Sequence, residues 1–131
     1  MALNVLLVDD SAIVRDIVGK SLGLSEVPLR EVFQAGNGRE ALDVLDKNWI
    51  DLVFCDINMP VMDGVELVER MARDDLLKTV PVVIISSQGS AERIEYLRSK
   101  GVRAYLRKPF TPEQIREVVF DVMGWGDGKG S

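Results

Sequence analysis

Short apolar runs recur along the chain at regular intervals, and the longest of them are continuous rather than alternating with polar residues. We expect five strands, at residues 4–8, 30–35, 51–55, 81–85 and 104–106. The first, third and fourth carry the unbroken runs, which are typical of parallel strands buried on both faces.

Between these runs, apolar residues recur at helical spacing. The five helical sets are Ile13, Val14, Ile17, Val18 and Leu22; Ala41, Leu42 and Leu45; Val65, Leu67, Val68 and Met71; Ile94 and Leu97; and Ile115, Val118, Val119 and Val122. The last helix has the clearest start, because Thr111 can cap it, Pro112 fits its first position and Gln114 can complete a capping box. Strict alternation of strands and helices predicts an α/β, doubly wound, mostly parallel sheet with helices on both faces.

The composition is that of a single folded domain. The chain has 131 residues, of which 47% are hydrophobic and 28% are charged, and one domain commonly takes about 100–200 residues. We expect this domain to cover residues 1–123. Residues 124–131 contain four glycines, and we expect them to form a flexible tail, either native or in part left over from expression.

Charge and residue types exclude several classes of function. The net charge is −5, which disfavours nucleic-acid binding, because that binding needs basic side chains to neutralise phosphates. One cysteine rules out an internal disulfide, and the lack of histidine removes histidine-based catalysis. The longest apolar runs have four residues, whereas a membrane span needs about 20. Since no signal peptide is recognisable either, we expect a cytoplasmic protein that does not bind membranes.

Polar side chains follow four of the five expected strands. They are Asp9 and Asp10 after the first strand, Asp56 after the third, Ser86 and Ser87 after the fourth, and Lys108 after the fifth. Any one of them alone would be read as an ordinary turn or capping residue. Because ligands of open α/β sheets bind outside the carboxyl ends of the strands, we expect these side chains to share one site.

The charges of this site favour a bound cation. Two carboxylates about 4 Å apart repel by roughly 4 kcal/mol at an effective dielectric constant of 20, so three of them need a counter-ion. Oxygen ligands without histidine or cysteine suit a hard ion, Mg²⁺ ahead of Ca²⁺, with Mn²⁺ as a substitute. A lysine can bind a phosphate oxygen, and an aspartate can accept a phosphoryl group as an acyl phosphate. The pattern therefore predicts phosphoryl transfer.

Four stretches of the chain resemble the receiver domain of two-component response regulators, of the stand-alone, CheY-like type. They are Val5-Leu6-Leu7-Val8-Asp9-Asp10-Ser11, Asp56-Ile57-Asn58-Met59-Pro60-Val61-Met62-Asp63-Gly64, Ile85-Ser86-Ser87 and Lys108-Pro109-Phe110. The resemblance implies a flavodoxin-like, five-stranded parallel sheet of order 2-1-3-4-5 with five helices. It also implies a cis peptide bond before Pro109 and a turn into the third helix at Asp63 and Gly64.

The resemblance assigns roles around the acidic residues. Asp56 is the implied phosphoacceptor. Asp9, Asp10 and Asp56 are the implied Mg²⁺ ligands, and Asn58 would add its backbone carbonyl. Asn58 and Gln88 stand two residues after the phosphoacceptor and the serine switch position, respectively, and are expected to tune the attack of water on the phosphoryl group.

The resemblance also identifies the residues that would respond to the phosphoryl group. Lys108 and Ser87 are the implied phosphate ligands, while Ser86 and Tyr105 occupy the serine/threonine and aromatic switch positions. Phosphorylation is expected to change the face made by the fourth helix, the fifth strand and the fifth helix, where a partner or a second copy would dock. Phe120, on the fifth helix, is expected to be at least partly exposed there.

Because the chain has no histidine, the phosphoryl donor must be another protein, either a histidine kinase or a histidine phosphotransfer protein. We expect a signalling switch rather than an enzyme. It would act on an output protein, for example in chemotaxis, as a monomer or a phosphorylation-dependent dimer. The alternative is an aspartyl-phosphate phosphohydrolase of the haloacid dehalogenase type. Such enzymes need Asp-x-Asp after a strand, and here Asn58 stands two residues after Asp56.

Overall fold

A computed structural model of the chain describes residues 2–87 and 91–125. Its sheet consists of β1 (Leu3–Val8), β2 (Leu29–Ala35), β3 (Leu52–Cys55), β4 (Val82–Ser86) and β5 (Ala104–Arg107). All neighbouring strands are parallel, in the order β2-β1-β3-β4-β5. The predicted fold and strand order are therefore confirmed, and no strand bound differs from its prediction by more than one residue.

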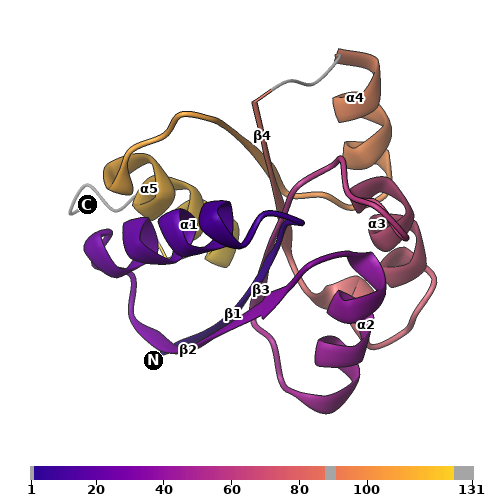
Figure 1. Cartoon of the computed structure of the whole chain (residues 1–131), viewed down its shortest axis with the longest axis horizontal. Helices are drawn as coiled ribbons and strands as arrows, with labels where there is room; N and C mark the ends of the chain where they lie inside the picture. The colour runs from indigo at the N-terminus through magenta and orange to yellow at the C-terminus, as the bar shows by residue number, and fades with distance from the viewer. Residues whose placement is uncertain (1, 88–90, 126–131) are drawn as a thin grey trace.

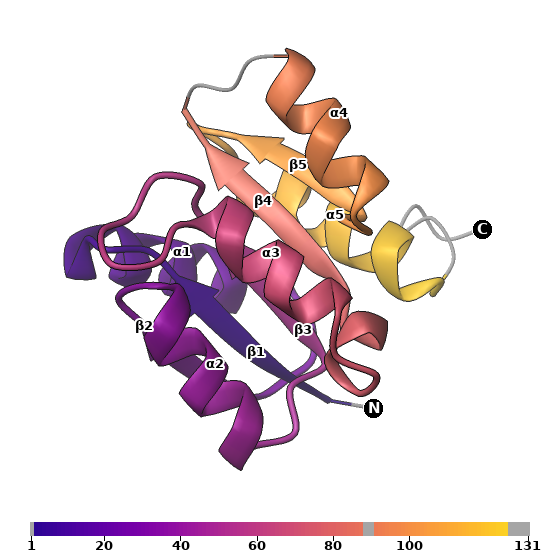
Figure 2. The same ribbon diagram turned by 90° about the vertical axis from the view of Figure 1, so that its right-hand side faces the viewer.

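Helices cover both faces of the sheet, as Figures 1 and 2 show. One face carries α1 (Ala12–Leu24) and α5 (Pro112–Met123). The other carries α2 (Gly38–Lys47), α3 (Gly64–Ala72) and α4 (Ala91–Ser99). A short 3₁₀ turn at Leu77–Thr79, which the apolar pattern does not predict, precedes β4.

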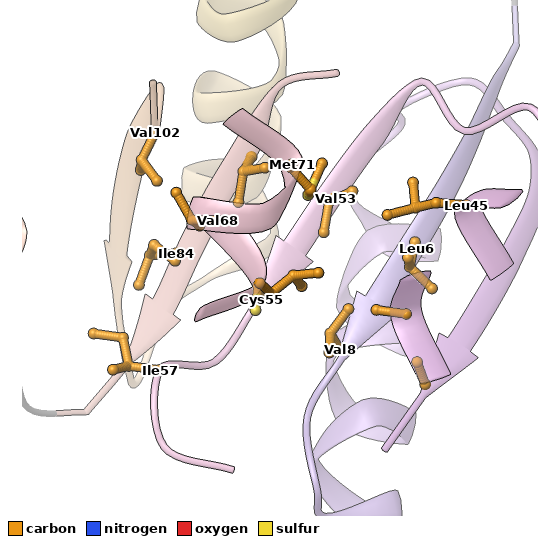
Figure 3. Packing of buried hydrophobic residues seen from close by; sticks show 14 of the residues in the cluster. Leu6, Val8, Leu45, Val53, Cys55, Ile57, Val68, Met71, Ile84 and Val102 are labelled. Carbon is orange, nitrogen blue, oxygen red and sulfur yellow. The ribbon is translucent and has the colours of Figure 1, made fainter. Parts of the chain in front are cut away.

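Each face of the sheet has its own hydrophobic core, because side chains alternate between faces along every strand. In β1, Leu6 and Val8 join the core under α2, α3 and α4, and Val5 and Leu7 join the core under α1 and α5. Figure 3 shows the first of these cores, where Leu6 lies beside Leu45 of α2. Burial on both faces explains why β1, β3 and β4 have continuous apolar runs.

The spacing of apolar residues in α1 predicts the helix but not the side that meets the sheet. Val18 and Leu22 are buried, whereas Ile13 and Ile17 are 74% and 55% exposed. The apolar residues of this helix are spread over about half its circumference, and Ile13 lies about 140° from Val18 at 100° per residue. Only the part of that arc near Val18 and Leu22 faces the core, so the remainder is solvent-exposed.

The last helix begins and ends as its sequence indicates. Thr111 and Gln114 form the predicted capping box, and Gly124 adopts a left-handed conformation after the last turn. Trp125 packs against the core, and its ring contacts that of Phe120 edge-on at 5.4 Å between centroids. Phe120 is half-buried, which confirms the expected partial exposure. Residues 126–131 of the expected tail lie outside the described residues.

Within residues 2–87 and 91–125, no helix combines the length and the apolar character that crossing a membrane would require.

Candidate functional site

Asp9, Asp10 and Asp56 lie together at the carboxyl edge of the central strands. Val8 of β1 pairs with Cys55 of β3, so the residues that follow these strands leave the sheet side by side. One carboxylate oxygen from each of the three aspartates lies within 4.8 Å of the others. Figure 2 shows β1 and β4 ending at this same edge. The acidic site expected from the sequence is therefore present in the fold.

Asp9 is the most firmly held of the three aspartates. It is buried, and one of its carboxylate oxygens accepts a hydrogen bond from the Ser11 backbone N–H at 2.9 Å. Its backbone carbonyl accepts a hydrogen bond from the Arg15 guanidinium at 2.5 Å. Its other carboxylate oxygen lies 3.4 Å from the Lys108 ammonium. Asp10, by contrast, is exposed. The cluster thus combines a fixed carboxylate with one that solvent reaches freely.

The Asp56 carboxylate occupies an environment that disfavours its negative charge. Asp56 is half-buried, and burial is the main cause that raises its pKa above the ordinary value, with a smaller contribution from Asp9 and Asp10. Lys108 and the Ile57 backbone N–H, which donates to Asp56 Oδ1 at 2.8 Å, act in the opposite direction. A cation bound among the carboxylates would relieve this cost.

The donor set of the cluster fits Mg²⁺. Three carboxylates supply only oxygen ligands, which is the chemistry that this hard ion prefers. A cavity of about 10 Å³ beside Asp9 and Asp56 is lined mostly by apolar side chains, such as Phe54. It is too small to enclose an organic substrate.

Lys108 comes to the site from the loop between β5 and α5. The Lys108–Pro109 peptide bond is cis, as the resemblance implies. The Lys108 backbone N–H donates to the Ser86 carbonyl at 3.0 Å. The side chain is mostly buried, and its ammonium points at Asp9. The structure thus brings one ammonium group to the edge where the three carboxylates meet.

Ser86 connects β4 to the site and to the edge strand. It is the last residue of β4 and is buried, and its carbonyl oxygen accepts the Tyr105 hydroxyl at 3.4 Å. Tyr105 is half-buried on β5, which is an outer strand of the sheet. Ser87 is exposed beside them, and Gln88 lies outside the described residues.

The loop from β3 to α3 packs closely against Asp56, the residue that follows β3. The Gly64 backbone N–H donates to the Ile57 carbonyl at 2.8 Å, and a Cβ atom at Gly64 would lie 2.3 Å from the Asp56 carbonyl oxygen. Asp63 caps α3 by accepting the Glu66 backbone N–H, which confirms the predicted turn into that helix. Glycine is therefore required where this loop touches the backbone of Asp56.

Two arginines at the site are absent from the sequence-based prediction. Arg15 stands four residues after Ser11, so the helical period places it back over the carboxyl edge, and this spacing was a usable signal. Arg93, on the first turn of α4, donates to the Asn58 side-chain oxygen at 3.4 Å. The two residues are 35 positions apart, and no local pattern indicates that they meet.

The chain is similar to known proteins in both sequence and structure. The sequence model of the family described as the response regulator receiver domain matches residues 5–120. The chain is 33% identical over 130 residues to the chemotaxis protein CheY homolog of Campylobacter jejuni, with 98% of each chain covered. It is 36% identical over 110 residues to the sporulation initiation phosphotransferase F of Bacillus subtilis, with 82% of this chain and 87% of that protein covered.

A solved structure is similar over nearly the whole chain. It is the complex of CheX and CheY with BeF₃ and Mg²⁺ from Borrelia burgdorferi, which matches with a TM-score of 0.82 and 27% sequence identity. The match covers 92% of this chain and 89% of that one. Sequence and structure therefore point to the same group of proteins.

Proposed function

The chain belongs to the response regulator receiver domain family, and we propose that it is a switch in which Asp56 accepts a phosphoryl group from another protein. The observation that carries the proposal is the cluster of Asp9, Asp10 and Asp56 with the Lys108 ammonium beside it. Acceptor, metal ligands and phosphate-binding cation are then on one edge of the sheet. We propose residues 1–123 as the receiver unit.

In the proposed reaction, a carboxylate oxygen of Asp56 attacks the phosphorus of a phosphohistidine. The new oxygen–phosphorus bond forms as the nitrogen–phosphorus bond breaks, and the bonding electron pair leaves with the imidazole nitrogen, which takes up a proton. The Ile57 N–H holds Oδ1 of Asp56, which leaves the second oxygen for attack. Lys108 binds a phosphoryl oxygen, and Ser87 is the further phosphate ligand.

Asp9, Asp10 and Asp56, with the Asn58 backbone carbonyl, would hold Mg²⁺. When bound, this ion neutralises negative charge that the carboxylates and the phosphoryl group bring together. The raised pKa of Asp56 supports this assignment. Burial and the neighbouring carboxylates disfavour the negative charge of Asp56, and a bound cation would offset that cost. Mn²⁺ is the expected substitute.

The response is proposed to run through Ser86 and Tyr105. The Ser86 hydroxyl turns toward a phosphoryl oxygen, and Tyr105 changes its rotamer on the outer strand β5. The existing contact between the Tyr105 hydroxyl and the Ser86 carbonyl supports a direct link between the two residues. An output protein, or a second copy of the chain, would then dock on the face made by α4, β5 and α5. Such a two-state element is what a phosphoryl group can bias.

A histidine kinase or a histidine phosphotransfer protein is the proposed donor, in the cytoplasm. The similar proteins in Campylobacter jejuni and Bacillus subtilis are named for chemotaxis and for sporulation phosphotransfer, respectively. Chemotaxis is the proposed pathway, because the chemotaxis protein is matched over 98% of both chains. The phosphohydrolase alternative is not favoured, since the family match covers residues 5–120 and Asn58 stands where that class has aspartate.

The test is phosphate incorporation from acetyl phosphate and Mg²⁺, followed by intact-protein mass spectrometry. Wild-type protein should gain one phosphoryl group, and Asp56→Asn should gain none, because the amide keeps the shape but loses the nucleophile. Asp43→Asn, on the exposed side of α2, is the matched control and should behave as wild type. Equal incorporation by wild type and Asp56→Asn would refute the assignment. Turnover of generic phosphate monoesters would favour the phosphohydrolase.

A further inference from the structure

Arg93 joins the helix α4 to the loop that carries the proposed phosphoacceptor. Its guanidinium donates to the Asn58 side-chain oxygen at 3.4 Å, although the two residues are 35 positions apart in the sequence. Asn58 stands two residues after Asp56, and both Arg93 and Asn58 are exposed at the rim of the site. The contact therefore joins the loop between β3 and α3 to the first turn of α4.

The same side of α4 makes a second polar contact with the acceptor side of the fold. Tyr96 lies three residues after Arg93, close to one helical turn, and its hydroxyl contacts the Glu69 carboxylate of α3. Figure 2 shows α4 running back from the carboxyl edge beside α3. The Arg93 side chain is thus aimed toward Asn58 by a helix that is itself tied to α3.

We infer that Arg93 is a positioning residue that lengthens the life of the phosphoryl group on Asp56 by holding the Asn58 side chain. This inference rests on the proposed function. A water molecule that hydrolyses the acyl phosphate must reach the phosphorus opposite the Asp56 oxygen. A side-chain amide that turns inward can orient such a water. In the structure the Asn58 oxygen is instead engaged by the guanidinium, at the rim.

The hydrolysis that Arg93 would slow is chemically simple. The water oxygen forms a new bond to phosphorus, and the bond from phosphorus to the Asp56 oxygen breaks. The bonding electron pair returns to the carboxylate, and the water protons leave with inorganic phosphate and solvent. Arg93 takes no part in these bonds. Its role is to keep the Asn58 side chain away from the attacking water.

The first experiment measures the decay of the phosphorylated protein after acetyl phosphate is removed. Arg93→Ala should decay about three- to tenfold faster than wild type, which converts to about 0.7–1.4 kcal/mol in the barrier, the net worth of one ordinary hydrogen bond. Arg98→Ala, on the exposed side of the same helix, is the matched control and should decay as wild type. Arg93→Lys keeps a cationic donor and should recover part of the lifetime.

The second experiment separates positioning from mere stabilisation of α4. If Arg93 acts through Asn58, then Arg93→Ala should have little further effect in an Asn58→Ala background, and the two changes should be clearly non-additive. Additive effects, or equal decay of wild type and Arg93→Ala, would overturn the inference while leaving the proposed function intact. Failure of the wild-type protein to take up any phosphoryl group would overturn the proposed function and this inference together.

Discussion

Helices α3 and α4 have nine residues each and cover the same face of the sheet, yet the core holds them very differently. In α3, the side chains of Leu67, Val68 and Met71 are buried. Of the nine residues of α4, only Leu97 is buried, and Ile94 is half-buried. Because burial of apolar surface supplies most of the energy that fixes a helix in place, α3 is anchored far more strongly than α4.

Polar contacts take a larger share in holding α4. Arg93 reaches Asn58, and the Tyr96 hydroxyl contacts Glu69, all of them exposed or only half-buried. A hydrogen bond of this kind contributes about 0.5–1.5 kcal/mol, which is less than the burial of one leucine side chain. The loop after Asp56, the proposed acceptor, therefore leads into the firmly held helix α3, whereas the surface proposed to respond includes α4, which can detach at a low cost in free energy. Asp56, the β3–α3 loop and α3 are called the rigid side of the fold below.

The largest loss of stability is expected from one methyl group added at Gly64, on the rigid side of the fold. Its Cβ would lie 2.3 Å from the Asp56 carbonyl oxygen, a backbone atom that cannot rotate away. We expect Gly64→Ala to lower the free energy of unfolding by about 4 kcal/mol or more. Urea denaturation measures the loss. Gly23→Ala in α1, where the added Cβ meets nothing within 4 Å, should instead gain about 0.5–1 kcal/mol.

Truncating one leucine in each helix compares the two anchors directly. Leu67 of α3 and Leu97 of α4 are both almost fully buried, at 0% and 1% exposure. We expect Leu67→Ala to cost about 3–4 kcal/mol, and Leu97→Ala about 2 kcal/mol, because a weakly held helix can move to fill the cavity. Both losses are read from urea unfolding curves. Equal losses would contradict the idea that α4 is the less constrained helix.

The strands, the helices and the position of the acidic cluster could be predicted from the sequence. Apolar runs located every strand, and helical spacing predicted all five helices. The polar residues after the strands identified the edge at which Asp9, Asp10 and Asp56 meet. These features are local, or they follow from the rule that parallel strands end at one edge. The strand order came from the resemblance rather than from the apolar pattern.

Features that depend on packing were not predictable from the residues alone. The exposed side of α1, with Ile13 and Ile17, follows from the angle at which the helix meets the sheet, and apolar spacing does not encode that angle. The requirement for glycine at Gly64 follows from its distance to Asp56 across the loop. The contact between Arg93 and Asn58 depends on where α4 lies, which weak local patterning leaves open.

The charged Asp56 carboxylate, on the rigid side of the fold, lowers the stability of the protein by an amount that can be measured. Burial raises the pKa of Asp56 above its ordinary value of 3.8, so the folded protein binds that proton more tightly than the unfolded chain. The contribution of Asp56 to the free energy of unfolding therefore falls as pH rises from 3.8 toward the raised folded value, and it stays lower at neutral pH. Asp56→Asn removes the charge. Without divalent ions it should be more stable at neutral pH by up to about 1 kcal/mol, allowing for solvent screening.

This advantage should vanish below pH 3.8, where the wild-type carboxyl is protonated in both states. Added Mg²⁺ should stabilise the wild type more than Asp56→Asn. The ion neutralises the negative charge of the carboxylates, and the variant has one carboxylate fewer. Chemical denaturation at the two pH values, with and without the ion, measures each difference. An Asp56→Asn protein that is less stable than wild type at neutral pH without divalent ions would contradict the assigned cost.

The smallest expected effect concerns backbone strain on the rigid side. Val61, in the loop between β3 and α3, has a φ of 68° and is 77% exposed. A left-handed conformation costs an ordinary residue roughly 1–2 kcal/mol, and it persists only where the surroundings enforce it. Asparagine tolerates this conformation better and keeps a side chain, so we expect Val61→Asn to raise the free energy of unfolding by about 0.5 kcal/mol. Leu76→Asn is the matched control, since Leu76 is 80% exposed with a φ of −86°, and it should bring no gain. If Val61→Asn destabilises the protein, the loop is not strained at this position, and the rigid side is held by packing alone.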